Sequence, residues 1–191
     1  LIIVCGFAGS GKSTLSENLG KEFGLKVVHA SHLLKELQTK KPSDLDIDNT
    51  KAGSGFWESK EGKQLLEKRQ KDFSLDKELD KKLQEIAKKG NVVLDSWTMP
   101  WLSKNGYKIW LNTSAKTRAK RVSKRDNLPE KEVLEKILDR DKKTAQIYQK
   151  IYGFEIGKDF APFNLLINAD KLNEKQVFEI AANETRKAFK K

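Results

Sequence analysis

Residues 6–14 read Gly6-Phe7-Ala8-Gly9-Ser10-Gly11-Lys12-Ser13-Thr14, between an apolar run at 1–5 and a helical pattern at 15–19. The spacing G-x-x-x-x-G-K-[ST] between a strand and a helix is that of a phosphate-binding loop. Its glycines can adopt backbone angles closed to other residues, so that the loop N–H groups can face inward. Lys12 is expected to bridge the outer phosphates of ATP, and the Ser13 hydroxyl to bind Mg²⁺. The sequence therefore predicts that residues 6–14 hold ATP.

The composition fits one α/β domain over residues 1–191. The chain has 191 residues, of which 37% are hydrophobic and 34% charged, enough for one core covered by solvated helices. No apolar run approaches the roughly 20 residues that span a bilayer, so we expect no membrane partner. A single cysteine, Cys5, excludes an internal disulfide and fits a buried position in a reducing cytoplasm. We expect a monomer or a weak dimer.

The net charge of +11 indicates acidic partners, either nucleotide phosphates or a nucleic acid such as RNA. The lysines are spread along the chain near Glu and Asp, which is also typical of an ordinary solvated surface. Arginine is different, because four of the six fall between residues 118 and 140. Arginine binds phosphate in a bidentate manner, so this clustering indicates a segment that faces phosphate.

Five short apolar runs predict strands, and helical patterns separate them. Strands separated by helices predict a three-layer α/β/α fold with a five-stranded parallel sheet. Ser31, Ser74 and Thr113 or Ser114 are expected helix caps, and the stretch Lys40–Gly55 is expected to be a loop that serves as a lid or a substrate arm. The expected strands cover residues 1–5, 26–29, 91–95, 107–112 and 164–168.

Asp95 ends the third predicted strand. In a parallel sheet the carboxyl ends of the strands hold the ligand, so Asp95 is expected to bind Mg²⁺ directly or through water. The other interpretation is a capping residue. The following segment, 96–102, is expected to be a loop whose Trp97 and Trp101 either stack on a base or fill the core. His29 and His32 are either catalytic or ordinary turn and core residues.

Arg118, Arg121 and Arg125 are spaced three and four residues apart, which places them along one helical face. A break at Asp126–Pro129 separates this helix from a long one that carries Arg140. Two arginine-rich helices that meet at a short break are typical of a closing lid, and the alternative is an exposed basic helix pair. These four arginines are our candidates for neutralising charge on the transferred phosphoryl group.

The chain resembles the P-loop nucleoside monophosphate kinases, specifically the archaeal-type cytidylate kinases. The likeness runs over most of the length and is strongest at residues 74–80, 85–94, 108–111, 118–121 and 151–153. It implies a substrate arm at about 30–72, a lid at about 125–150, and transfer of the γ-phosphoryl group of ATP to CMP or dCMP with Mg²⁺. It also implies that residues 6–14 form the ATP loop and that the four arginines are lid and phosphate ligands.

The chain departs from that family on the acceptor side. Lys35, Trp97 and Ile147 occupy positions where the family has arginines, and residues 52–58 resemble an insertion. Each lost charge-assisted contact weakens the binding of a buried phosphate by roughly 1.5–3 kcal/mol. Lys35, Trp97 and Trp101 are therefore our candidate acceptor-side residues.

Two other functions stay open. One is a kinase for a nucleoside, sugar or RNA hydroxyl, for which Asp95 would be the general base. The other is a nucleotide-binding regulator or ribosome-assembly ATPase that hydrolyses ATP without a small acceptor.

Overall fold

The computed structural model describes residues 1–39 and 59–190, and within them the predicted five-stranded parallel sheet is confirmed. The strand order is β2-β3-β1-β4-β5, so the chain leaves the central strand β1 first toward one edge and later toward the other. The predicted loop 40–55 and the resemblance to an insertion at 52–58 lie outside the described residues. The strands are β1 (Ile2–Cys5), β2 (Lys26–His29), β3 (Val92–Asp95), β4 (Tyr107–Asn112) and β5 (Leu165–Asn168).

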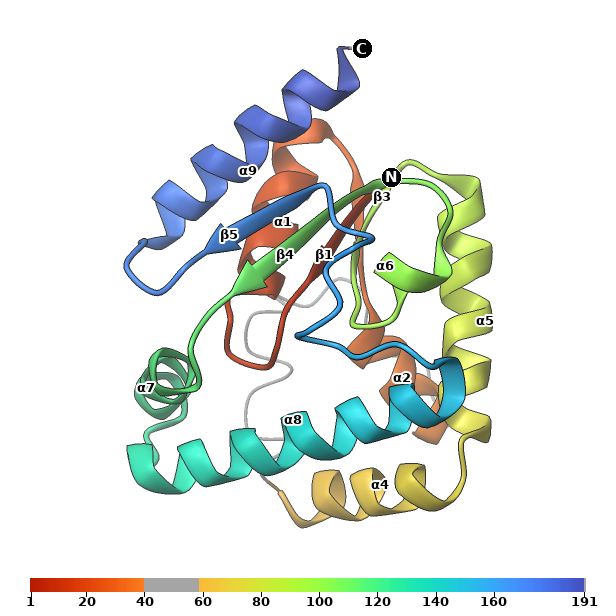
Figure 1. Ribbon diagram of the computed structural model, residues 1–191, viewed down its shortest axis with the longest axis vertical. Helices are drawn as coiled ribbons and strands as arrows, with labels where there is room; N and C mark the ends of the chain where they lie inside the picture. The colour runs from red at the N-terminus through yellow and green to blue at the C-terminus, as the bar shows by residue number, and fades with distance from the viewer. Residues whose placement is uncertain (40–58, 191) are drawn as a thin grey trace.

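Helices cover both faces of this sheet, as the sequence predicts for a three-layer fold (Figure 1). The helices α1 (Lys12–Phe23) and α9 (Glu174–Phe189) pack on one face. The other face is covered by α2 (Ala30–Thr39), α5 (Ser74–Lys89) and α6 (Met99–Leu102). The strands β1 and β3 are buried along their whole length, which is why both read as unbroken apolar runs.

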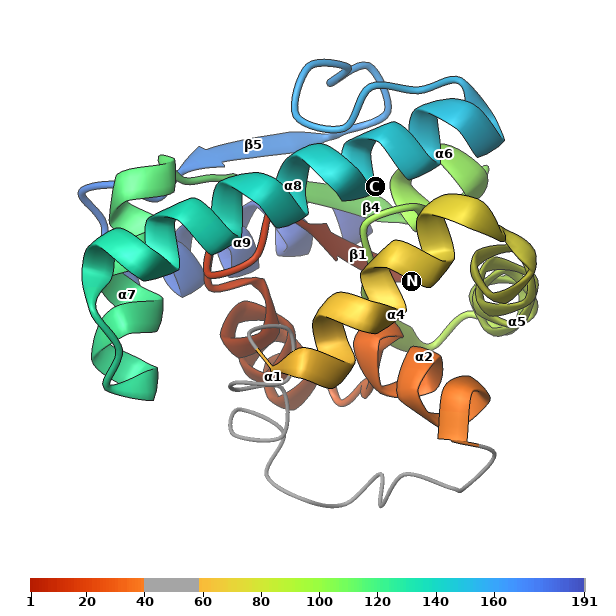
Figure 2. The same cartoon turned by 90° about the horizontal axis from the view of Figure 1, so that it is seen from below.

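Three further helices lie at the carboxyl ends of the strands. They are α4 (Lys60–Lys71), α7 (Ala115–Asp126) and α8 (Glu130–Tyr152). In Figure 1, α8 runs across the sheet below the strand ends, and Figure 2 shows α4 lying alongside it. Because ligands of open parallel sheets bind outside the carboxyl ends of the strands, the candidate site is expected at this end of the sheet.

Local differences from the predicted boundaries have local causes. The helix α2 begins at Ala30, directly after β2, so Ser31 lies inside it and does not cap it. Ser74 is the first residue of α5, and the N-cap position belongs to Phe73. The segment expected to be a loop after β3 contains the short helix α6, with a proline in its first turn, where the missing N–H is tolerated. The cap predicted at Ser114 is confirmed, since its side chain accepts a hydrogen bond from the Thr117 N–H.

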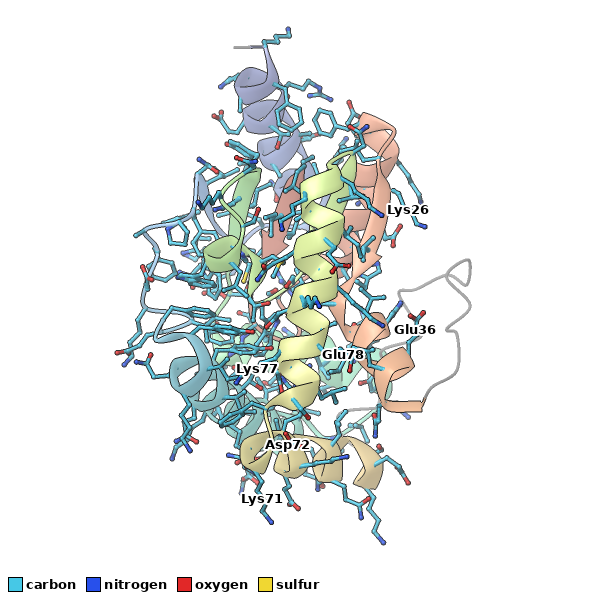
Figure 3. All side chains as sticks on the ribbon, turned by 90° about the vertical axis from the view of Figure 1, so that its right-hand side faces the viewer. Lys26, Glu36, Lys71, Asp72, Lys77 and Glu78 are labelled. Atoms are coloured by element: carbon cyan, nitrogen blue, oxygen red, sulfur yellow. The ribbon has the colours of Figure 1, made fainter. Side chains whose placement is uncertain are left out.

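The surface of α5 carries charges of both signs. In Figure 3 the helix faces the viewer, and Lys77 and Glu78 lie on its outward side. Lys82 and Glu78 form an exposed ion pair of 3.8 Å one turn apart, of a kind that adds little stability. On this face the basic residues are interspersed with acidic ones, as expected for an ordinary solvated helix.

A buried polar network joins α5 to α4 and α8. Arg69 of α4 binds Asp76 of α5 through two guanidinium nitrogens, at 2.6 and 3.1 Å, and its Nη2 also donates to the Tyr148 hydroxyl of α8. One turn further along α5, Asp80 accepts hydrogen bonds from Thr98 at 2.5 Å and from Tyr152 at 2.7 Å. The network therefore fixes α4 against the rest of the molecule with satisfied polar groups.

Burial raises the pKa of Asp80 to about 6, although the Thr98 and Tyr152 hydrogen bonds lower it. The folded protein therefore binds more protons at this group than the unfolded chain between about pH 4 and pH 6. As a result, the contribution of Asp80 to the free energy of unfolding falls as the pH rises through this window. Relative to Asp80→Asn, we expect the wild type to lose about 2–3 kcal/mol of its free energy of unfolding between pH 4 and pH 8.

Urea unfolding of both proteins across that pH range measures this shift. Asp139→Asn is the matched control, because Asp139 is an exposed residue whose partner is Lys143 one turn away. A constant difference between wild type and Asp80→Asn over the whole range would contradict the prediction.

Candidate phosphate-binding site

The loop between β1 and α1 has the backbone that the glycine spacing predicts. Gly6, Gly9 and Gly11 have φ angles of 155°, 78° and 97°. At Gly9 a Cβ atom would lie 2.9 Å from Val122 Cγ2 and 3.1 Å from the Arg118 carbonyl oxygen, so α7 approaches the loop backbone directly. Only glycine combines this φ with this close approach.

The amino end of α1 opens toward the same loop. Gly11 is the N-cap in the left-handed conformation, and it has no side chain to satisfy the first N–H groups of the helix. Within the described residues no side chain caps these N–H groups, and together with the positive end of the helix dipole they form an anion-binding position. The loop and the helix end are therefore ready to accept phosphate oxygens.

Lys12, Ser13 and Asp95 come together at the carboxyl ends of β1 and β3. The strands are paired in register, with Val4 beside Asp95, so that Asp95 projects next to the start of α1. The Ser13 hydroxyl donates a hydrogen bond of 2.7 Å to Asp95 Oδ2, and Lys12 Nζ lies 3.8 Å from Asp95 Oδ1. The two residues that sequence analysis assigns to Mg²⁺ thus share one hydrogen bond.

His29 completes this cluster from β2, the strand on the other side of β3. His29 is paired with Asp95 in the sheet register, and its Nδ1 lies 2.9 Å from Asp95 Oδ2. Its Nε2 lies 2.7 Å from Glu17 Oε1 on α1. Burial lowers the pKa of His29, but the hydrogen bonds and charges of Asp95 and Glu17 outweigh it, so the pKa lies above its ordinary value.

The surroundings of Asp95 keep it ionised. Burial raises the pKa of this carboxyl, but the charge of Lys12 and the hydrogen bonds from His29 and Ser13 lower it by a larger amount. The net result is a pKa well below the ordinary value. An ionised carboxylate beside a serine hydroxyl is the protein part of a typical Mg²⁺–nucleotide site, in which phosphates and water supply the other oxygens. The donor set therefore fits Mg²⁺.

Arg118 contacts the backbone of the loop. Its guanidinium donates to the carbonyl oxygens of Thr113 and Ala8 at 3.1 Å each and pairs with Asp141 of α8 at 2.7 Å. It also lies over the Phe7 ring, 5.2 Å from its centre. The side chain is buried in these contacts, so in this conformation it supports the loop backbone, and its predicted role as a phosphate ligand stays a prediction.

Arg121 lies on the same helix as Arg118 and also contacts the loop, but it lines the cavity. Its two terminal nitrogens donate to the carbonyl oxygens of Ser10 at 3.0 Å and Ala169 at 2.7 Å. Arg125 makes two hydrogen bonds to Asp126, of 2.6 and 2.7 Å, and Arg140 lies over the Trp97 ring at 5.7 Å. The three residues Arg121, Arg125 and Arg140 all line the cavity described next.

A cavity of about 610 Å³ extends from the loop across the amino end of α9. The loop residues Ala8 to Thr14 line it, as do His29 and His32. Val122 and Ile137 supply an apolar wall on α7 and α8. The volume and the mixture of apolar walls with a few charged groups fit a nucleotide-sized ligand. The wall contributed by α9 and the turn before it was not predicted from sequence, and it consists of Leu172, Asn173, Glu174 and Val177.

The candidate acceptor-side residues do not line this cavity. Trp101 stacks on Phe154 with ring centres 4.2 Å apart, and its Nε1 donates to Asp159 at 2.7 Å. Trp97 packs edge-on against Phe7 of the loop, at 5.6 Å. Lys35 is half-buried on α2, and this burial lowers its pKa. The structure thus brings together the predicted ATP-side residues and leaves these three outside the described cavity.

Two of the positions where the resemblance implies arginine form part of the apolar core. Ile147 is 1% exposed and Trp97 9% exposed. Both belong to one cluster with Leu66 of α4, Tyr148 of α8 and residues of β1 and β4. The apolar substitutions are therefore compensated by packing between α4, α8 and the segment after β3.

A parallel sheet with a glycine loop, a helix end, a lysine and a carboxylate at its central strand defines a P-loop nucleotide-binding protein. Within this class, the chain belongs to the Cytidylate kinase-like family, whose sequence model matches residues 2–171.

Curated relatives agree with this assignment. The chain is 31% identical to a cytidylate kinase of Sulfurisphaera tokodaii over 94% of this chain and 92% of that protein. It is 32% identical to a cytidylate kinase of Pyrococcus horikoshii over 94% of this chain and 85% of that protein. It is 29% identical to one of Methanocaldococcus jannaschii over 96% of each chain. The resemblance drawn from the sequence is thereby confirmed.

Solved structures share the fold at low sequence identity. A shikimate kinase of Bacteroides thetaiotaomicron has a TM-score of 0.55 and 18% identity over 100% of this chain and 98% of its own. A deoxyadenosine kinase of M. mycoides has a TM-score of 0.54 and 20% identity over 97% of this chain and 98% of its own. These neighbours support the P-loop kinase fold.

Sequence analysis missed the supporting residues of the site. Glu17 and Asp141 have no motif, and their roles depend on which helices meet. From sequence, His29 is either catalytic or structural, and the available signal is its place at the end of a predicted strand. No helix in the described ranges, 1–39 and 59–190, is long and apolar enough to cross a membrane.

Proposed function

We propose that the protein is a Mg²⁺- and ATP-dependent phosphotransferase that acts on a nucleoside monophosphate, with CMP or dCMP as the first candidate acceptor. The single observation that carries the proposal is the meeting of Lys12, Ser13 and Asp95 at the open end of α1. The family and the relatives named cytidylate kinase support the choice of acceptor. In the reaction the bond between the γ-phosphorus and the β–γ bridging oxygen breaks, and a bond to an acceptor phosphate oxygen forms.

Each residue has a role that its geometry supports. The loop N–H groups and Lys12 bind the β- and γ-phosphates, and Arg121, Arg125 and Arg140 oppose the charge of the phosphoryl group from the cavity wall. Ser13 and Asp95 would hold Mg²⁺, which supplies electrostatic stabilisation of the phosphate oxygens when bound. A monophosphate acceptor is already ionised, so no strong general base is needed, and positioning accounts for most of the catalysis.

A second candidate is an acceptor that offers a hydroxyl group, such as a nucleoside, a sugar or an RNA. The buried cluster around Trp97 and Ile147 favours it, because two of the arginines that the resemblance implies for an acceptor phosphate are replaced by apolar contacts. For such an acceptor Asp95 would be the base, yet its lowered pKa makes it a weak one. This is why we place the monophosphate first.

A panel of acceptors with γ-labelled ATP tests the proposal. It contains CMP, dCMP, UMP, AMP and GMP, the matching nucleoside cytidine, transfer RNA and a sample without acceptor. We expect labelled diphosphate from CMP or dCMP above all other samples. Label in cytidine or RNA would support the second candidate, and release of phosphate without any acceptor would support an ATPase.

The same function carries our proposals on organisation. We propose one kinase domain over residues 1–191, with a substrate arm at about 30–72 and a lid at about 125–150. A free buried thiol at Cys5 and the need for ATP support a cytoplasmic location. The oligomeric state, monomer or weak dimer, stays a prediction, as does binding of RNA.

A further inference from the structure

We propose that His29, itself held by Glu17, is a positioning residue that aims the Asp95 carboxylate at the magnesium ion of the bound nucleotide. The inference rests on the proposed function, because it needs Mg²⁺ and ATP at the loop. Neither residue belongs to the glycine-rich motif. The three residues form a chain of two hydrogen bonds from Asp95 through the imidazole to α1.

The chain of contacts is short and buried. His29 is 5% exposed and Asp95 4% exposed, so water has little access to compete for either group. The contacts to Asp95 Oδ2 and Glu17 Oε1 measure 2.9 and 2.7 Å. Ionised carboxylates only accept hydrogen bonds, so each ring nitrogen donates to its carboxylate. With both nitrogens engaged, the ring can neither flip nor rotate without losing a contact.

The direction of these contacts determines what His29 does for Asp95. Both Ser13 and His29 donate to Oδ2, and Lys12 approaches the other oxygen, Oδ1, at the longer distance of 3.8 Å. Lys12 is also the residue proposed to bind the phosphates, and a side chain that moves toward a ligand can no longer hold Asp95. His29 comes from a neighbouring strand and is tied to α1, so its contact does not depend on the nucleotide. It therefore keeps the carboxylate aligned in both states.

Glu17 connects this support to the phosphate-binding helix. It lies one turn after Ser13 on α1, and its contact with His29 joins the helix to the end of β2. Metal sites commonly have such a support, in which a carboxylate orients an imidazole and the imidazole orients a metal ligand. Loss of such a partner typically lowers metal affinity about 10–100-fold.

Two amide variants separate the two contacts of the ring. The amide nitrogen of His29→Asn reaches about where Nδ1 lies, so this variant can still donate to Asp95. The longer His29→Gln places its amide near Nε2, where it meets Glu17, so Asp95 loses the donor on β2 and keeps only that of Ser13. His29→Leu removes both contacts.

The measured quantity is the gain in ATP affinity caused by magnesium, the ratio of the Kd in EDTA to the Kd in Mg²⁺, obtained by calorimetry. We expect His29→Gln and His29→Leu to lower this ratio about 10-fold or more, and His29→Asn to stay within about 3-fold of wild type. The Kd in EDTA is measured for each variant as well, so that a loss of affinity common to both conditions is separated from a loss of the magnesium gain. Thermal melting checks that each variant is folded.

Unchanged magnesium gain in folded His29→Gln and His29→Leu would overturn the inference. An equal loss of affinity with and without magnesium in all three variants would also overturn it, because it would indicate a general structural role. If the His29 variants do not fold, Glu17→Leu and Glu17→Gln replace them. The first should lower the gain, and the second, which keeps an acceptor oxygen for Nε2, should preserve it. Absence of ATP binding by the wild-type protein would instead contradict the proposed function.

Discussion

Replacing Lys12 by alanine is expected to reduce ATP-dependent phosphoryl transfer about 10²- to 10³-fold, which is the usual loss when one preorganised electrostatic contact to the transition state is removed. The side chain lies at the start of α1 beside Asp95, where its charge reaches the position proposed for the outer phosphates. Initial rates with saturating ATP and the best acceptor measure the effect.

The fold should survive this change. Asp95 keeps its hydrogen bonds from Ser13 and His29, so the carboxylate is not left without donors. Lys21→Ala is the matched control, because Lys21 is an exposed lysine in the last turn of the same helix. Lys12→Ala activity close to that of Lys21→Ala, in a protein with wild-type melting, would contradict the loop assignment.

Replacing Arg69 by methionine should destabilise the protein by about 3–5 kcal/mol, because it leaves the buried charge of Asp76 without its partner. Asp76 is 1% exposed and Arg69 4% exposed, and the guanidinium contacts both carboxylate oxygens. The free energy of unfolding in urea measures the loss. The effect concerns stability, since the pair lies in the network between α4, α5 and α8.

Two variants test whether the unpaired charge is the cause. Arg186→Met removes an exposed arginine that pairs with Glu22, and its expected effect is about 0–1 kcal/mol. The double variant Arg69→Met with Asp76→Leu removes both charges and should recover much of the lost stability. An Arg69→Met protein no less stable than Arg186→Met would contradict this interpretation.

The ATP side of the molecule could be predicted because its signals are local. The spacing G-x-x-x-x-G-K-[ST] between an apolar strand and a helix is specific for a phosphate-binding loop, and Gly6, Gly9 and Gly11 have the positive φ angles that this loop needs. The strands were equally readable, since buried parallel strands are continuous apolar runs. Asp95 followed from a general rule about strand ends.

The supporting contacts could not be predicted because they depend on which strands and helices become neighbours. The strand order places β2 beside β3, and only this order brings His29 to Asp95. Helical spacing correctly groups Arg118 with Arg121. It does not reveal that Arg118 is buried between the loop and Asp141.

The acceptor side was read least well from sequence, for a physical reason. A tryptophan after a strand can stack on a ligand or fill the core, and the choice depends on what packs against it. Trp101 meets Phe154 and Phe163, which come from the segment after α8 more than 50 residues away. Trp97 meets Phe7 and the cluster that includes Ile147. No local pattern contains this information.

Nucleotide binding at the glycine loop is tested by calorimetric titration of the purified protein with ATP in the presence of Mg²⁺. We expect saturable binding of one nucleotide per chain that Lys12→Ala weakens strongly and Lys21→Ala leaves unchanged. If the folded wild-type protein bound neither ATP nor any other nucleoside triphosphate, the loop would not be a nucleotide site and the proposed kinase function would be wrong.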